Sequence, residues 1–157
     1  MTTVAQVGLR DAFARAGYTQ ESLARALRVD QPVDAGTARA NRSRLGRSPL
    51  DTLVCLFLTG EALPRSTVAE ALDVEAAVAL GLLEGEAELS APFVINEWQG
   101  CYLAHDHDAQ MEFDHVTGIS NATRTLAALT PRRRVHRALD LGTGCGSQAL
   151  LASRHAD

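Results

Sequence analysis

The residues with the clearest chemical pattern are an aspartate and a set of glycines. Asp140 lies in a short apolar run at residues 137–141. Three glycines follow it at alternate positions, Gly142, Gly144 and Gly146. Residues 147–152 then favour a helix with one apolar face. This order predicts a strand, a sharp turn and a helix. Glycine permits positive φ and close approach of a ligand, and free N–H groups at a helix start attract electron-rich groups. We therefore expect a ligand at this turn.

Three classes of cofactor are bound by turns of this kind, and the residue types distinguish them. A phosphate-binding loop needs a lysine, and the sequence contains none. A dinucleotide site has the pattern G-x-G-x-x-G/A, in which Ser147 would take the third position. An NAD(P)-dependent oxidoreductase therefore stays an alternative.

The third class fits best. The run at residues 139–146, Leu-Asp-Leu-Gly-Thr-Gly-Cys-Gly, closely resembles motif I of the class I S-adenosylmethionine-dependent methyltransferases. The acid two residues before the first glycine is characteristic of that family. Residues 114–123, with Leu126 and Ala127, resemble the segment before motif I in small-domain enzymes similar to the glutamine-N5 and ribosomal RNA base methyltransferases. The resemblance implies that S-adenosylmethionine is held by Asp140, Gly142, Thr143, Gly144, Cys145 and Gly146, and is covered by Val116, Thr117 and Gly118.

The same resemblance implies methyl transfer, to a nitrogen of a protein, an RNA or a small molecule. The acid that holds the ribose is expected about 20 residues after the glycines, which is past Asp157. The Asn-Pro-Pro-Tyr type motif of the family does not occur in the sequence. We therefore expect the N-terminal part of a methyltransferase, inactive alone, and no catalytic residue can be named.

Two parts of an α+β fold are expected along the chain. In residues 1–110 the clearest helix start is residues 48–51, Ser-Pro-Leu-Asp, which resemble a capping box with proline at the first helical position. Alternation over residues 87–95 and an apolar run at 101–103 predict a hairpin turning at 96–100. Helices followed by a hairpin are typical of a winged-helix-like domain, and this part resembles the accessory domain fused to such methyltransferases. Residues 111–157 would open an incomplete Rossmann-like methyltransferase domain.

A second hypothesis is a module that binds RNA or a protein through this helical part. A basic patch lies on or near the expected third helix, at Arg39, Arg42, Arg44 and Arg47. Such a patch could contact RNA phosphates. The net charge of −4 argues against a protein that coats nucleic acid by charge alone.

Other patterns exclude further classes. The histidines and acids at residues 105–115 match no established zinc spacing, so a polar linker is expected there and no metal. The three cysteines are too widely spaced for a disulfide framework. The sequence has no secretory signal and no apolar run of about 20 residues, so we expect a cytoplasmic protein away from membranes.

Overall fold

The computed structural model describes residues 4–107 and 114–157, and the side chains from residue 8 onward within the first helix. Its helices and strands follow one another in the order α1 (Val4–Ala16), α2 (Gln20–Leu27), α3 (Ala35–Ala40), η1 (Arg42–Arg44), α4 (Pro49–Val54), η2 (Cys55–Thr59), β1 (Leu63–Pro64), α5 (Arg65–Ala69), α6 (Val74–Ala79), β2 (Glu88–Leu89), β3 (Val94–Trp98), β4 (Cys101–His105), α7 (Asn121–Leu129) and α8 (Ser147–Ala152). The expected α+β class is confirmed at this level, with two small antiparallel sheets.

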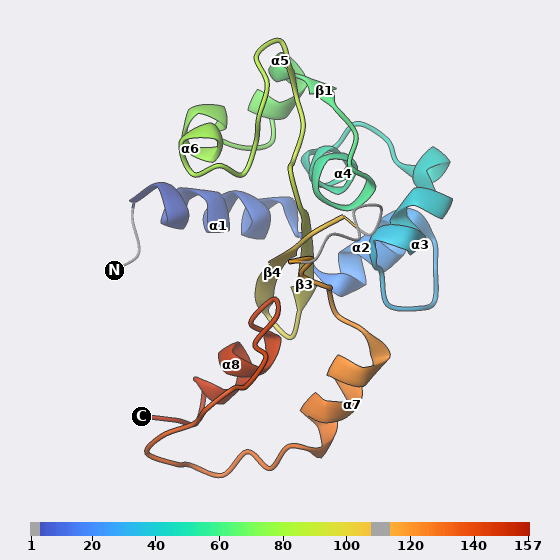
Figure 1. Ribbon diagram of the computed structural model, residues 1–157. Helices are drawn as coiled ribbons and strands as arrows, with labels where there is room; N and C mark the ends of the chain where they lie inside the picture. The colour runs from blue at the N-terminus through green and yellow to red at the C-terminus, as the bar shows by residue number, and fades with distance from the viewer. Residues whose placement is uncertain (1–3, 108–113) are drawn as a thin grey trace.

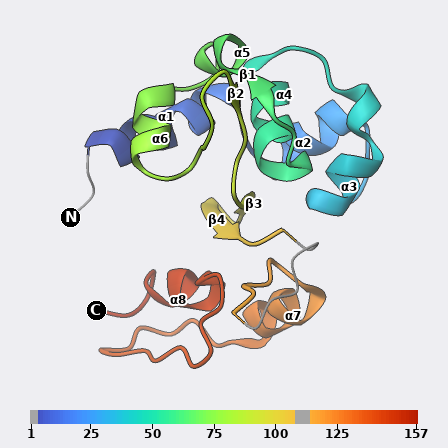
Figure 2. The same cartoon turned by 45° about the horizontal axis from the view of Figure 1, so that its top comes forward.

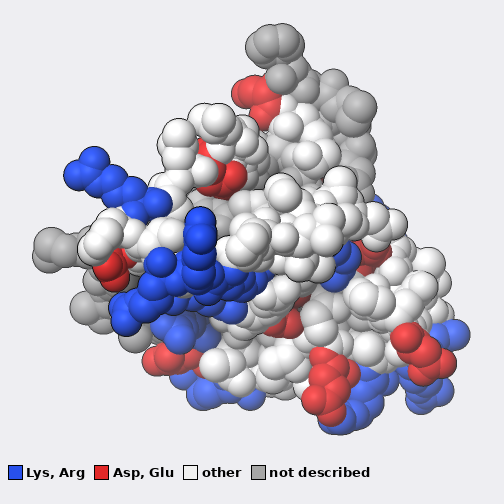
Figure 3. All heavy atoms as spheres, turned by 90° about the horizontal axis from the view of Figure 1, so that it is seen from below, with Lys and Arg blue, Asp and Glu red and all other residues white. Residues whose placement is uncertain are grey.

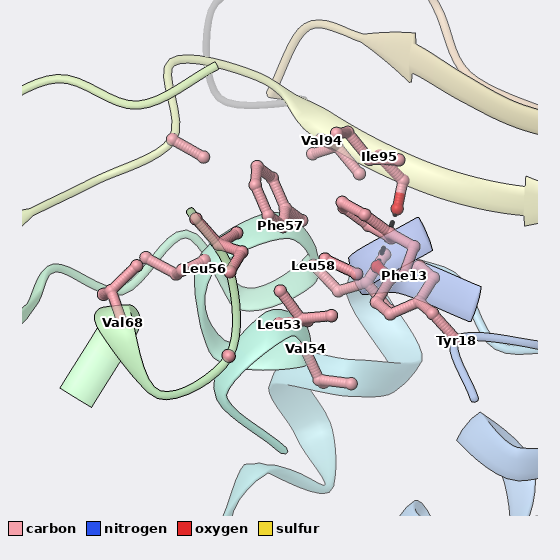
Figure 4. Close-up of a cluster of buried hydrophobic side chains, with 14 of the residues drawn as sticks. Phe13, Tyr18, Leu53, Val54, Leu56, Phe57, Leu58, Val68, Val94 and Ile95 are labelled. Carbon is pink, nitrogen blue, oxygen red and sulfur yellow. Dashed lines mark hydrogen bonds between the residues drawn. The ribbon is translucent and has the colours of Figure 1, made fainter. Parts of the chain in front are cut away.

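The central helix forms as its sequence predicts. Ser48 accepts from the Asp51 N–H, and the Asp51 carboxylate accepts from the Ser48 N–H, which completes the capping box. The helix continues from α4 into the π-helical turn η2 and ends at Gly60, whose φ of 77° is left-handed. Its side chains from Leu53 to Leu58 are buried and form the centre of the main core (Figure 4). This core extends from Leu9 on α1 to Ile95 on β3.

The turn of the hairpin β3–β4 is shorter than the predicted turn at residues 96–100. Val94 pairs with His105 and Trp98 with Cys101. Gln99 and Gly100 alone make the turn, and both have positive φ, as in the two-residue turns that match strand twist. Residues 96–98, expected in the turn, therefore belong to β3. The first part of the predicted strand also separates, because Pro92 has no N–H to donate. The short strand β2 pairs with β1 instead.

The two faces of this hairpin pack against different parts of the chain. Ile95 and Tyr102 lie on one face and pack on the main core, where the buried hydroxyl of Tyr18 donates to the Ile95 carbonyl oxygen at 2.8 Å. Burial raises the pKa of Tyr18, so the donor stays protonated. On the other face, Trp98 and Leu103 form a second cluster with α7 and α8. The hairpin therefore lies between the N-terminal helices and the C-terminal segment (Figures 1 and 2).

The predicted strand at residues 137–141 is wrong. This segment has no strand pairing, and Leu139 and Leu141 are each 82% exposed. A strand needs a hydrogen-bonded neighbour, and no described strand lies beside it. The nearest pairing is one parallel bridge between Val135 and Ala156. The described residues thus form no Rossmann-like sheet, whereas the predicted helix forms as α8.

The predicted domain boundary and the predicted polar linker lie partly or wholly outside the described residues. The boundary at residues 110 and 111 and the middle of the linker lie outside the described residues, while Ala104 and His105 complete β4. In the part of the chain that the structure describes, no helix combines the length and apolar character needed to cross a membrane.

Candidate functional site

The glycine-rich turn has the backbone geometry that its sequence predicts. The φ angles of Gly142, Gly144 and Gly146 are 69°, 53° and 79°, all in the left-handed region that side chains with a Cβ disfavour. Gly142 and Gly144 are exposed, and Gly146 stands at the N-cap of α8. A Cβ added at Gly142 or Gly146 would meet no atom within 4 Å. The glycines are therefore required by the chain's conformation, and the space over the turn is open.

Asp140 holds this turn to its helix. Its Oδ2 accepts a hydrogen bond from the N–H of Ala149 at 3.1 Å, which satisfies one of the helix-start donors that Gly146 has no side chain to cap. The Thr143 hydroxyl donates to the Asp140 carbonyl oxygen at 3.2 Å, and the Gly146 N–H donates to the Thr143 carbonyl oxygen at 2.9 Å. Cys145 lies half-buried in the turn with a free thiol. Hydrogen bonds thus connect Asp140, Thr143 and Gly146 of the six predicted residues and tie the turn to α8.

Two open clefts flank Asp140. One, of about 400 Å³, has Leu126, Leu139 and Gln148 in its wall. The other, of about 520 Å³, is lined by Ala138, Ala149 and Asp157 with Asp140. Because apolar and polar groups converge on one carboxylate, this end of the molecule has the room and the chemistry for a small ligand.

The residues expected to cover the cofactor lie elsewhere. Val116 forms a backbone pair with Asp106, and its N–H also donates to Asp106 Oδ2 at 2.7 Å. Thr117 and Gly118 line a different cleft, beside Asn96 and His105. The structure therefore brings Asp140 and the glycines together, and places Thr117 and Gly118 on a separate cleft.

Two arginines of the predicted basic patch, Arg42 and Arg44, bind groups of the chain itself. Arg42 forms an ion pair with Glu61, and the hydrogen bond between them raises the pKa of Arg42 and lowers that of Glu61. Arg44 donates to the carbonyl oxygens of Leu27 at 2.7 Å and Arg28 at 2.8 Å, at the end of α2. These two arginines stabilise the loop after α3, which weakens the case for an RNA-binding face there.

A second group of arginines lies between α7 and α8. All four are exposed: Arg132, Arg133, Arg134 and Arg137. Figure 3, which views the molecule from the side of α7 and α8, shows basic side chains gathered on this face. Arg132 donates to the Ala127 carbonyl oxygen at 2.7 Å, and Arg134 lies 3.5 Å from Asp157. The four guanidinium groups thus add positive charge to the exposed surface between α7 and α8.

The polar segment beyond β4 shows no metal centre in the described residues. No group of three histidine, cysteine, aspartate or glutamate side chains there is placed to hold an ion. His115 Nδ1 lies 3.9 Å from Asp106 Oδ2. Asp108 and Glu112, also in this predicted polar segment, lie outside the described residues.

Sequence reasoning missed the pair formed by Asn96 and His105. Both are 6% exposed, and Asn96 Nδ2 lies 2.7 Å from His105 Nε2. Diagonal positions across a hairpin bring them together. The sequence predicted Asn96 in the turn at residues 96–100, so its place in β3 diagonal to His105 had no signal.

Comparison with known proteins gives one match. Residues 15–92 are similar to a family described as a domain of unknown function (DUF7059). The match covers the helical part, from the end of α1 to β2, and excludes both the hairpin β3–β4 and the glycine turn. A search among curated proteins finds no match to the chain.

Proposed function

We propose that this chain supplies the cofactor-binding turn of an S-adenosylmethionine-dependent methyltransferase. The observation that carries the proposal is the turn from Asp140 to Gly146, in which three glycines at alternate positions all have positive φ. Its sequence closely resembles methyltransferase motif I, and the open space over Gly142 and Gly146 would suit a ligand lying against the backbone.

The chain's own residues would bind and orient the cofactor. The exposed backbone of Gly142 and Gly144 allows close approach, and Asp140 keeps one carboxylate oxygen on Ala149 while it lines both neighbouring clefts. When bound, S-adenosylmethionine supplies an activated methyl group, and an acceptor nitrogen would attack it in line. The protein's contribution is positioning. Residues that bind the acceptor are not assigned in this chain.

The test is calorimetric titration of S-adenosylmethionine, and separately of NADH, into the complete gene product. We expect S-adenosylmethionine alone to bind, and the variant Asp140→Asn to weaken binding at least tenfold. Asparagine can still accept from Ala149, so the turn should stay folded. The exposed Asp30 offers the control Asp30→Asn, which carries the same charge change and should bind normally.

The other outcomes are equally clear. Binding of NADH in place of S-adenosylmethionine would support the dinucleotide alternative. Absence of binding by either would mean that the glycine turn serves only the chain's conformation, and the helical part would become the place to look for function.

A further inference from the structure

An open groove lies where helix α1, the segment after α6 and the hairpin β3–β4 meet (Figure 1). Its volume of about 290 Å³ is at the lower end of the range for small-molecule sites. No residue after Ala104 lines it, so it is separate from the glycine turn. The apolar part of its wall consists of Leu9 and Phe13 on α1, Leu80 and Leu82 after α6, and Ile95 on β3.

Contacts between aromatic rings give this wall a defined shape. Phe13 is 3% exposed, and its ring centroid lies 5.0 Å from that of Tyr102 and 4.9 Å from that of Tyr18. Figure 4 shows Phe13 and Tyr18 beside Ile95. Because these rings come from α1, the segment before α2 and β4, the main core fixes the groove from several sides.

Arg10 is the one charged side chain among the described residues that line the groove. It is exposed, and it lies three positions before Phe13 on α1, so both residues are on one side of the helix. Arg10 forms no hydrogen bond or ion pair with the described residues. Its guanidinium group, with five N–H donors, is therefore available to a ligand.

The hydroxyl group of Tyr102 is a second donor at the same groove. Burial and the charge of Glu97 raise the pKa of Tyr102, whereas the charge of Arg10 lowers it. The guanidinium group therefore lies within electrostatic reach of the phenol. Because the raised pKa keeps the phenol protonated at neutral pH, Tyr102 can donate, and it makes no hydrogen bond to the described residues.

Glu97 lies on the same face of the hairpin, opposite Tyr102, but its carboxylate is already bonded. It is 9% exposed, and its two oxygens accept the N–H groups of Gln20 and Gly100, each at 2.8 Å. Glu97 does not line the groove. The free charge at the groove is thus the positive charge of Arg10.

We propose that this groove binds a small carboxylate with an apolar body. The body packs against the apolar wall, and the carboxylate accepts hydrogen bonds from Arg10 and Tyr102. The charge of Arg10 selects an anion, and the apolar wall selects an anion that carries a ring or a chain. The proposal is independent of the methyltransferase proposal, because it uses no residue of the glycine turn.

The experiment is a titration followed by ¹H–¹⁵N correlation spectra of the labelled chain at neutral pH. Three probes share one skeleton, anionic phenylpropionate, neutral phenylpropionamide and cationic phenylpropylammonium, and acetate has the charge without the apolar body. We expect phenylpropionate to shift the signals of residues 9–13, 80–82 and 102–104. Phenylpropionamide should shift them more weakly, and phenylpropylammonium and acetate should not.

Matched variants test the roles of the two donors. Arg10→Gln removes the charge at an exposed position, and it should weaken phenylpropionate binding about threefold or more without changing phenylpropionamide binding. The control Arg15→Gln makes the same charge change on the same helix, at an exposed residue that does not line the groove, and should leave both unchanged. Tyr102→Phe keeps the ring and should weaken phenylpropionate binding less than Arg10→Gln does.

Equal binding of phenylpropionate by Arg10→Gln and Arg15→Gln would overturn the proposal, as would equal shifts with acetate or no shifts at these residues with phenylpropionate. S-adenosylmethionine is titrated separately. Its binding at residues 140–146 without phenylpropionate binding would leave the methyltransferase proposal standing and remove this one.

Discussion

At the scale of single residues, the ion pair of Arg42 and Glu61 stabilises the loop after α3, whereas the sequence indicated Arg42 only as part of a basic patch. The hydrogen bond from Arg42 lowers the pKa of Glu61 below its usual value. A carboxylate with a lowered pKa in the folded state stabilises the protein above its unfolded pKa. That stabilisation is lost as pH falls through the folded pKa. Acid should therefore weaken the attachment of the loop after α3 to the end of η2.

We predict that Glu61→Gln lowers the free energy of unfolding at pH 7 by less than about 1 kcal/mol, because both side chains are partly exposed. The difference from the unmodified protein should shrink as the pH falls below 4.5, the ordinary value for Glu61. Urea unfolding across a pH series measures this. Glu86→Gln, at an exposed glutamate, is the control. A difference that stays constant in acid would contradict the predicted role of the pair.

The residues that could be predicted from sequence are those whose role is local. Asp140 and the glycines act within ten residues of one another, so their spacing alone indicates a turn before a helix. Asn96 and His105 are brought together only by the register of the hairpin. Arg44 was predicted only as part of a basic patch that could contact RNA. Its carbonyl partners at the end of α2 are 16 and 17 residues away, so the sequence did not indicate them. Contacts of this kind follow from the fold and leave no pattern in the sequence.

At the scale of elements, end signals predicted helices better than apolar patterns predicted strands. Ser48 caps the helix that it was expected to start, and Asp34 caps α3 in the same way. These caps work through hydrogen bonds to the next three residues, so the sequence contains all the partners. Strand pairing has no such local partner. Residues 137–141 have a strand-like composition but no described strand to pair with. The alternation over residues 87–95 predicted one strand, but Pro92 divides it into β2 and the start of β3.

The hairpin is attached to the helical part by two hydrogen bonds that Gln20 donates to Glu97. Glu97 Oε2 accepts the Gln20 N–H at 2.8 Å, and Gln20 Nε2 donates to the Glu97 carbonyl oxygen at 2.9 Å. Gln20 also donates to the Val33 carbonyl oxygen and accepts the Val33 N–H. The other carboxylate oxygen of Glu97 accepts the Gly100 N–H at the turn. One glutamine and one glutamate thus connect α2, the segment before α3 and the hairpin.

We predict that Gln20→Ala and Glu97→Gln each lower the free energy of unfolding by about 1–3 kcal/mol, since each leaves buried partners unsatisfied. The double variant should be less destabilised than the sum, with a coupling of about 0.5–3 kcal/mol. Urea unfolding of the four proteins gives this value. Gln148→Ala, which removes one hydrogen bond to the Thr123 carbonyl oxygen, should cost less than Gln20→Ala. Each side chain contacts the backbone of the other residue, so the coupling acts through the shared attachment, and strict additivity would contradict it.

At the scale of the whole molecule, the hairpin separates two clusters of unequal size. Among the residues that the structure describes, the main core holds most of the buried apolar side chains, whereas the second cluster has four buried members, Trp98, Leu103, Ala127 and Leu151. Large apolar side chains remain exposed around it, including Leu129 at 75% and Leu139 at 82%. Stability follows the buried apolar area, so the two clusters should differ in local stability.

We predict that the second cluster opens before the main core unfolds. Trp98, the one tryptophan of the sequence, lies in that cluster and reports on it by fluorescence. Its transition in urea should precede the loss of helical circular dichroism, which comes mostly from α1 to α6. Amide exchange should likewise be faster in α7 and α8 than in α4 and β3. Trp98→Phe should lower the protection of the α8 amides against exchange. It should leave the free energy of unfolding of the main core nearly unchanged. Coincident fluorescence and dichroism curves would instead mean that both clusters unfold as one cooperative unit. The hairpin would then couple them, because Ile95 in the main core and Trp98 in the second cluster belong to the same strand.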